Sequence, residues 1–396
     1  MLELLDLVAR WVHVIAGIMW IGNSMLFNWL DRSLRPGQGD VYGDLWLIHS
    51  GGFYLVEKNK GERRPDGTRA LPTPLHWFKW QAYTTWISGA ALLVVVYYVG
   101  GRALIVDPAI KDIPSHVGSA IAISTIIGAW LLYELLWRAV AQWSGRAARA
   151  GTLAVLAGAS WILLSFLSGR AAFLHVGAML GTLMAANVVF TIMPAQRELV
   201  SALAAGREPM QHLADPAKLR SIHNNYFTFP AIVLMLSAHF PALYSQRSGF
   251  GALVMLGIAG AGVRHILNIR FTYAHWKPAL AVAIALPLIL LGSLMMVKPS
   301  DRRTGDAAAS PPTATFADAQ RIIDRRCASC HSANPADISL GAMPSGVAFD
   351  SPQQIQALTD RILERAVTTR TMPPANKTRM TDAEREVLRA WASRSN

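Results

Sequence analysis

The chain has 396 residues, of which 52% are hydrophobic and only 16% are charged. This composition is too apolar for an ordinary water-soluble protein of this length, and the 13 tryptophans suit the aromatic belts of membrane proteins. The net charge of +12 does not indicate a nucleic-acid-binding protein, because most of the excess Lys and Arg lies in loops between apolar segments. We therefore expect an integral membrane protein that contacts lipid and binds no nucleic acid.

The first apolar segment follows an acidic start, Met1 to Asp6, whereas a secretory signal peptide begins with basic residues. We therefore expect this segment to be a transmembrane helix. A span needs about 20 apolar residues, and the sequence predicts eight of them: 8–30, 80–100, 117–138, 151–168, 172–194, 226–244, 249–269 and 278–297. The predicted fold is an all-α, eight-span transmembrane helical bundle over residues 1–298, followed by a small domain.

Basic residues are unevenly distributed among the predicted connections. Those after spans one, three, five and seven are rich in Lys and Arg, whereas those after spans two, four and six carry only Arg102, Lys111, Arg170 and Arg247. The positive-inside rule places the basic connections in the cytoplasm. An even number of spans then places both termini and the C-terminal domain on the periplasmic side of a bacterial inner membrane. The first connection, about 31–78, is long enough to have a function of its own.

Three histidines, His13, His175 and His239, fall in the outer half of the predicted spans. Ionisable groups inside a membrane are costly, so each of them is a candidate site. Two interpretations remain open: axial ligation of a b-type haem between helices, or hydrogen bonds across the bundle. Gly177 and Gly181 have the GxxxG spacing, which allows a neighbouring helix to approach closely beside His175.

A second polar group is predicted near the inner ends of the spans. The group comprises the segments His49 to Tyr54 and Arg220 to Tyr226, and Arg264-His265 with Asn268, and its main candidate residues are Arg220, Arg264, His223, His265, Asn224 and Asn225. Together they can hold a flat polar anion. The alternative is an interfacial rim, in which Arg and His side chains extend toward lipid phosphates.

Residues 299–315 are polar and contain an alanine run and two prolines, which predicts a linker. Beyond it, residues 316–396 are predicted to form a small domain with helices at about 316–329, 352–367 and 381–394. Two of these helices have capping-box start signals, Ser351 with Gln354 and Thr381 with Glu384.

The motif Cys327-Ala328-Ser329-Cys330-His331 predicts covalent attachment of haem c through the two cysteines, with His331 as an axial ligand of the iron. A zinc site is disfavoured because residues 332–396 contain no further Cys or His. Met372, between prolines in Thr371-Met372-Pro373-Pro374, is the predicted second axial ligand, and Met343 and Met380 are the alternatives. This segment resembles single-haem cytochrome c domains.

Several motifs along the chain resemble those of the membrane-bound urate hydroxylases: Trp11 to Gly22, Gly51 to Tyr54, Trp77 to Trp80, His175 to Thr182, His223 to Tyr226, and Arg264-His265. The resemblance implies an eight-span bundle fused to a cytochrome c domain. It also implies oxidation of urate to 5-hydroxyisourate, with electrons leaving through the cytochrome to a terminal oxidase or a soluble cytochrome.

On this resemblance, His223 or His265 is the general base and Arg220 or Arg264 binds the urate anion, together with Asn224 and Asn225. Two other functions remain open at this point. One is a non-enzymatic cytochrome subunit that carries electrons from quinol to an oxidase, and the other is a transporter or sensor that contains haem.

Overall fold

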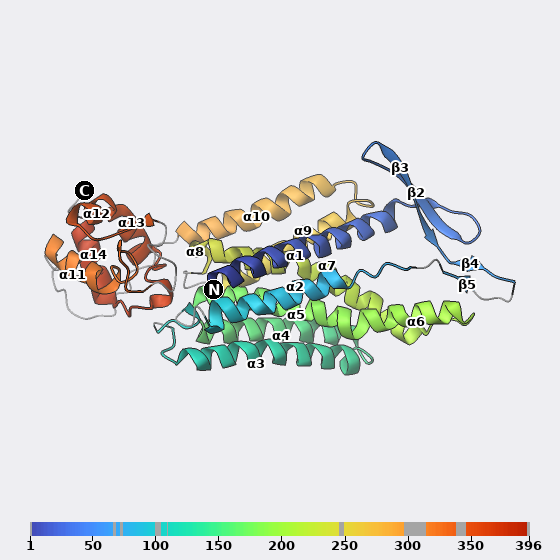
Figure 1. Ribbon diagram of the computed structural model, residues 1–396, viewed down its shortest axis with the longest axis horizontal. Helices are drawn as coiled ribbons and strands as arrows, with labels where there is room; N and C mark the ends of the chain where they lie inside the picture. Colours follow the sequence, from blue (N-terminus) through green and yellow to red (C-terminus); the bar gives the residue numbers. More distant parts are fainter. Residues whose placement is uncertain are drawn as a thin grey trace.

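The computed structural model describes residues 2–65, 69–71, 74–99, 104–108, 110–244, 249–296, 314–337 and 346–393. These residues form a long bundle of helices with a small helical domain at one end and a β-hairpin at the other (Figure 1). The helices of the bundle are α1 (Leu2–Ser33), α2 (Trp80–Leu93), α3 (Ser115–Leu135), α4 (Gly145–Phe166), α5 (Gly169–Asn187), α6 (Met193–Ala204), α7 (Gln211–Leu236), α8 (Pro241–Tyr244), α9 (Gly249–Ile269) and α10 (Trp276–Met296).

Short π-helical segments extend three of these helices. They are η1 (Val94–Val99) after α2, η3 (Leu136–Val140) after α3, and η4 (Val188–Ile192), which joins α5 to α6. A 3-10 turn, η5 (Ser237–His239), follows α7.

Within the described residues, seven helices are long and apolar enough to cross a membrane: Leu4–Ser33, Trp80–Val99, Ser115–Val140, Gly145–Phe166, Gly169–Ala204, Gly249–Ile269 and Trp276–Ser293. They coincide with seven of the eight predicted spans. The prediction of 226–244 as a span is wrong in its bounds, because α7 ends at Leu236 and contains many polar residues in its first half. The helix nevertheless lies inside the bundle, packed against α5 and α9.

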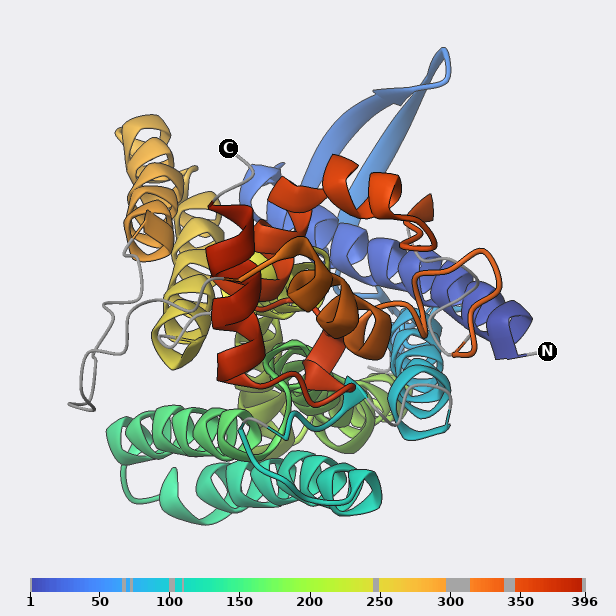
Figure 2. The same cartoon turned by 90° about the vertical axis from the view of Figure 1, so that its left-hand side faces the viewer.

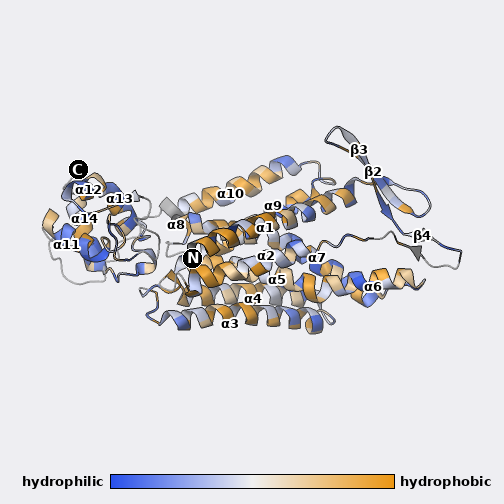
Figure 3. Ribbon diagram, viewed as in Figure 1, coloured by the Kyte–Doolittle hydropathy of each residue, from blue (hydrophilic) through white to orange (hydrophobic). Residues whose placement is uncertain are grey.

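The core of the bundle lies where α3, α4, α5, α7 and α9 meet. Its fully buried side chains include Leu163, Phe173, Met179 and Leu234. By contrast, α1 and α10 expose large apolar side chains such as Leu288. Figure 3 shows mostly apolar residues along the helices of the bundle and more polar residues in the parts at its two ends. An apolar surface of this extent suits contact with lipid.

The first long connection forms strands, so the all-α prediction is wrong there. Strands β1 (Arg35–Pro36), β2 (Val41–His49) and β3 (Gly52–Asn59) form an antiparallel sheet in that order, and β4 (Glu62–Arg63) pairs with β5 (Arg69–Ala70). Ser50 and Gly51 both have positive φ, 52° and 75°, as a tight two-residue hairpin turn requires. Aromatic and branched residues on both sides of this Ser-Gly turn were the available sequence signal.

The C-terminal domain contains α11 (Phe316–Arg326), α12 (Pro352–Ala357), α13 (Thr359–Ile362), η7 (Leu363–Thr368), η8 (Pro374–Asn376) and α14 (Asp382–Ala392). Both predicted capping boxes are confirmed, and Thr315 forms a third one with Asp318. The predicted helix 352–367 is interrupted at Leu358, and of the predicted linker, residues 299–313 lie outside the described residues.

The C-terminal domain lies against the end of the bundle where α1 begins, and the hairpin lies at the opposite end (Figure 1). Figure 2, viewed along the bundle, shows the domain in front of the helices. One contact between the two parts is a bidentate ion pair. Arg379 donates from both Nη atoms to the two oxygens of the Asp112 carboxylate, at 3.1 Å each. The start of α1 and the C-terminal domain therefore lie at one end of the bundle, as an even number of spans predicts.

Candidate functional site

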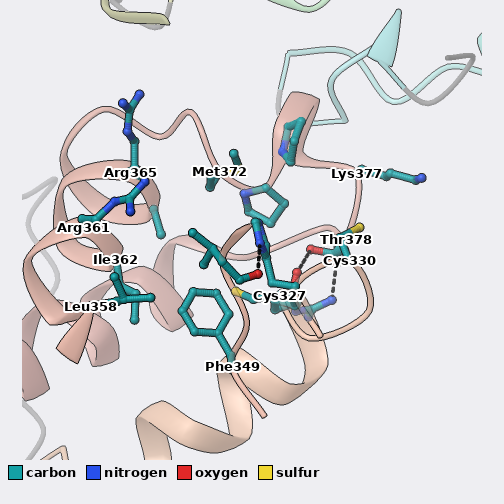
Figure 4. A pocket seen from close by; sticks show the side chains of 16 residues that line it. Cys327, Cys330, Phe349, Leu358, Arg361, Ile362, Arg365, Met372, Lys377 and Thr378 are labelled. Carbon is teal, nitrogen blue, oxygen red and sulfur yellow. Dashed lines mark hydrogen bonds between the residues drawn. The ribbon is translucent and has the colours of Figure 1, made fainter. Parts of the chain in front are cut away.

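The C-terminal domain contains a cavity of about 260 Å³ that the predicted haem-binding residues line (Figure 4). Cys327, Cys330, His331 and Met372 all contribute to its wall. The remaining lining is mostly apolar with a few cationic residues: Val347, Phe349, Leu358, Ile362, Ala366, Pro373, Pro374, Thr378, Arg326, Arg361, Arg365 and Lys377.

The end of α11 positions the Cys-x-x-Cys-His motif against this cavity. The Cys327 N–H donates to Ile323 O at 2.7 Å, and the His331 N–H then donates to Cys327 O at 2.9 Å, so the motif forms a turn. The His331 Nδ1 lies 3.1 Å from Val347 O and donates to it. This tautomer leaves the lone pair of Nε2 available for a metal ion.

Met372 is held in the cavity wall by backbone hydrogen bonds. Its N–H donates to Arg365 O at 3.0 Å, and its carbonyl accepts from Nη1 of Arg385 at 3.0 Å. Met380, in contrast, is buried in the core of the domain, and Met343 lies outside the described residues. Of the two methionines that can be compared, Met372 is the one that lines the cavity.

Burial raises the pKa of the Cys327 thiol to about 12. Burial also raises the pKa of Cys330, and the negative charge of Asp337 adds to this effect. Both sulfurs are therefore neutral thiols near pH 7, unlike the thiolates of redox or nucleophilic cysteines. Within the described part of the chain, no three His, Cys, Asp or Glu side chains are grouped closely enough to hold a metal ion.

Asp350 fixes the loop that follows His331. Its carboxylate accepts hydrogen bonds from the Ser332 hydroxyl and from the Ala333 N–H, the latter at 2.8 Å, and these bonds lower the pKa of Asp350. The site therefore provides two thiols, an imidazole with one unused nitrogen, a thioether and an apolar cavity with cations in its wall. This donor set fits a covalently attached porphyrin, and the cations of the wall fit its carboxylates.

The structure distinguishes between the three outer histidines. His175 is fully buried and uses both ring nitrogens, since Nδ1 donates to Ala171 O at 2.7 Å and Nε2 accepts from the Tyr98 hydroxyl at 2.9 Å. His13 uses Nδ1, which lies 2.9 Å from Thr85 O. His239 lies in η5, beyond the end of α7. These bonds favour the hydrogen-bonding interpretation for His175.

The prediction that a helix packs closely at the GxxxG motif is confirmed for its first glycine. A Cβ atom at Gly177 would lie 3.2 Å from Met235 Cγ and 3.4 Å from Ala231 O, both on α7. At Gly181 the nearest atom would be Met235 Cε, at 3.8 Å. The small side chains therefore serve the packing of α5 on α7.

The predicted inner polar group is divided by α7 into two clusters. The first, called the Arg220 cluster, consists of Tyr133 and Glu134 on α3, Asn187 on α5, and Arg220, His223 and Asn224 on α7. Arg220 donates from Nη2 to the Glu134 carboxylate at 2.9 Å, and its guanidinium carbon lies 4.4 Å from the centre of the Tyr133 ring. The Tyr133 hydroxyl lies 2.8 Å from His223 Nδ1.

Asn187 closes this cluster. Its Nδ2 donates to the Tyr133 hydroxyl at 3.1 Å and to Asn224 Oδ1 at 2.8 Å. Tyr133, Glu134 and Asn187 are members of this cluster that were not predicted from the sequence. A carboxylate inside an apolar span was the signal that would have identified Glu134.

The second cluster, called the Arg264 cluster, consists of Ser24 on α1, Asn225 on α7, and Arg264 and Asn268 on α9. The Arg264 side chain donates from Nε to Asn225 Oδ1 at 3.1 Å and from Nη2 to Ser24 Oγ at 3.3 Å. Asn268 donates from Nδ2 to the same Asn225 oxygen at 2.6 Å. Arg264 is only 1% exposed.

His265 does not join Arg264, although the two are adjacent in sequence. Its imidazole is on the exposed side of α9, where Nδ1 lies 2.7 Å from the Tyr226 hydroxyl. Successive residues of a helix point about 100° apart, which explains the separation of His265 from Arg264 and of Asn224 from Asn225. The structure therefore does not unite the six predicted residues in one site.

A protein-family comparison matches residues 1–296 to the family described as Urate oxidase N-terminal. The chain belongs to this family. The match ends with α10, so it covers the bundle with both polar clusters and excludes the cavity of the C-terminal domain. Comparisons with curated proteins and with solved structures gave no match. Membership of the urate oxidase N-terminal family makes the chain a urate-oxidase-related oxidoreductase.

Proposed function

We propose that this protein is a membrane-bound urate hydroxylase that oxidises urate to 5-hydroxyisourate and passes the electrons to a c-type haem in its C-terminal domain. The observation that carries the proposal is that one chain combines a bundle of the urate oxidase N-terminal family with a cavity lined by Cys327, Cys330, His331 and Met372. A terminal oxidase or a soluble cytochrome is the proposed electron acceptor.

Cys327 and Cys330 would hold the haem through thioether bonds, and His331 and Met372 would bind its iron. When bound, this group accepts electrons one at a time. Oxidation of urate to 5-hydroxyisourate consumes one water and releases two electrons and two protons, so two successive electron transfers are needed per substrate molecule. The residues of the bundle then have to bind the anion and accept protons.

His223 is the better candidate for the proton acceptor, because it lies among buried polar groups, whereas His265 is exposed. Both polar clusters lie toward the end of the bundle away from the C-terminal domain. Glu134 is about 20 residues along the chain from Asp112, which corresponds to about 30 Å along a helix. Electrons therefore have to cross much of the bundle.

His13 and His239 are the residues of the bundle that would hold a b-type haem, a group that would supply single-electron transfer there. His175 is no longer proposed as a ligand, because both of its nitrogens already make hydrogen bonds. The bundle is proposed to span a bacterial inner membrane, with the C-terminal domain in the periplasm. The apolar outer surface and the uneven distribution of Lys and Arg support this topology.

The test is to add urate without oxygen to oxidised membranes from a bacterium that matures c-type cytochromes and expresses this protein. We expect the haem absorption bands to change to those of the reduced form. The control is His331→Ala in the same host, in which urate should not produce the spectrum of the reduced wild-type haem. Haem that is loaded and reduced by quinol but not by urate would refute the proposal and indicate an electron-carrier subunit.

A further inference from the structure

The two buried guanidinium groups of the bundle differ in how their charge is balanced. Arg220 pairs with the Glu134 carboxylate at 2.9 Å, although its Nη1 is buried without a partner among the described residues, and Glu134 also accepts a hydrogen bond from Arg138 at 2.5 Å. Arg264 is equally buried, but its hydrogen-bond partners are the neutral side chains of Asn225 and Ser24. Among the residues that the structure describes, no carboxylate pairs with Arg264.

The neighbouring helices contain no suitable carboxylate either. Neither α9 nor α10 has an Asp or Glu. The acid of α7 is Asp215, near its first turn, where it accepts a hydrogen bond from Gln211 at 2.7 Å. On α1, Asp31 is paired with Lys58 at 2.7 Å and Asp6 with Arg10 at 2.8 Å, and Glu3 is in the first turn, more than 20 residues along the helix from Ser24. A buried cation without a counter-ion is unfavourable, which points to an anionic ligand.

The hydrogen-bonding capacity around Arg264 also fits an anion. The Asn225 Oδ1 atom accepts from both Arg264 and Asn268, so this oxygen is occupied. Neither Nη1 of Arg264 nor Nδ2 of Asn225 makes a hydrogen bond to a described residue. The groups left over in this cluster are these two N–H donors and the Oδ1 acceptor of Asn268. A planar anion with several carbonyl oxygens needs such donors, and a guanidinium binds it in its own plane.

A close contact between helices holds Arg264 in place. A Cβ atom at Gly260 would lie 2.7 Å from Pro230 N and 2.9 Å from Phe229 C, so α9 touches the backbone of α7 at this glycine. Gly260 lies one turn before Arg264 and on the same face of α9. The guanidinium is thereby held beside α7, with its carbon 5.4 Å from the centre of the Phe229 ring.

We infer that the Arg264 cluster is the urate-binding site, in which Arg264 supplies the counter-charge for the purine anion and Asn225 Nδ2 donates to one of its carbonyl oxygens. In the Arg220 cluster the guanidinium already has a carboxylate partner, Glu134, and His223 of this cluster remains the proposed proton acceptor. This inference rests on the proposed function, since it takes urate as the substrate.

The test is the substitution Asn225→Asp in the full-length, haem-loaded protein. It places a carboxylate where Oδ1 now lies, 3.1 Å from Arg264 Nε, and so gives the cation an internal counter-ion. We expect the KM for urate, measured by anaerobic haem reduction, to rise at least tenfold, which corresponds to about 1.4 kcal/mol. The thermal unfolding temperature without urate should stay the same or rise, and added urate should no longer raise it.

Two further variants complete the experiment. Arg264→Gln should also raise the KM at least tenfold, and the matched control Lys218→Gln, an exposed cation on α7, should leave it unchanged. A wild-type KM in both Asn225→Asp and Arg264→Gln would overturn the inference and leave the proposed function intact. The inference would also be overturned if Asn225→Asp lost urate binding and its unfolding temperature fell as far as that of Arg264→Gln. The loss of binding would then come from destabilisation of the bundle. Failure of urate to reduce the wild-type haem would instead refute the proposed function.

Discussion

Arg385 determines the position of the proposed axial ligand without being a ligand itself. It lies on α14, is 5% exposed, and donates hydrogen bonds from Nη1 to the carbonyls of Ala366 and Met372, the latter at 3.0 Å. Its Nη2 makes a weaker contact with Asn376 Oδ1 at 3.4 Å. The substitution Arg385→Gln would remove the contacts that join the Met372 loop to α14.

The size of the effect follows from these bonds. Each carbonyl left without a donor costs about 1–3 kcal/mol. Burial lowers the pKa of Arg385, which shows that its charge is held at some cost, and removing that charge offsets part of the loss. We therefore expect Arg385→Gln to destabilise the C-terminal domain by about 2–3 kcal/mol. The haem reduction potential should fall, because a less constrained Met372 ligates the iron less well and Met ligation raises the potential.

The assay is a spectroscopic redox titration of the haem, combined with denaturant unfolding of the full-length protein followed by the haem absorption bands. The matched control is Arg389→Gln on the same helix, because Arg389 is 46% exposed and its ion-pair partner in the described part of the chain is Glu386, at 3.2 Å. We expect both quantities to remain near their wild-type values in the control. A wild-type potential in an Arg385→Gln protein that is destabilised as expected would refute the positioning role of Arg385.

Three further results are expected. Met372→Ala should change the haem spectrum while the bundle stays inserted, and an unchanged spectrum would show that another group ligates the iron. The carboxylate of Asp350, whose pKa is lowered, stabilises the domain above its unfolded pKa of about 3.9 and loses this effect as the pH falls through its folded pKa. The free energy of unfolding should therefore fall less steeply with decreasing pH in Asp350→Asn than in the wild type. The same pH dependence in both proteins would exclude this contribution of Asp350. Gly260→Ala should destabilise the bundle by about 1–3 kcal/mol, because the new methyl group meets the backbone at Pro230. Gly262→Ala, where the Cβ would meet open space, is its control in thermal unfolding, and equal losses in both would contradict the contact.

Helices of the bundle were predictable because long apolar runs have few alternatives to a helix in lipid. The start of α9 at Gly249 and its end at Ile269 agree with the predicted span, and seven predicted spans coincide with apolar helices. The hairpin β2–β3 was not predicted, because its strands interrupt a sequence whose other long elements are all apolar helices. The polar α7 was misplaced because its first half is not apolar.

The sequence by itself determined the local features of this protein. The Cys327 to His331 motif, the capping boxes at Ser351 and Thr381, and the apolar helices depend on residues that are neighbours along the chain, so their spacing can be read directly. Only the tertiary structure decided how charges are balanced between helices. It pairs Arg220 with Glu134, 86 residues away, and leaves Arg264 with neutral partners, because α7 presents Asn224 and Asn225 to different neighbouring helices.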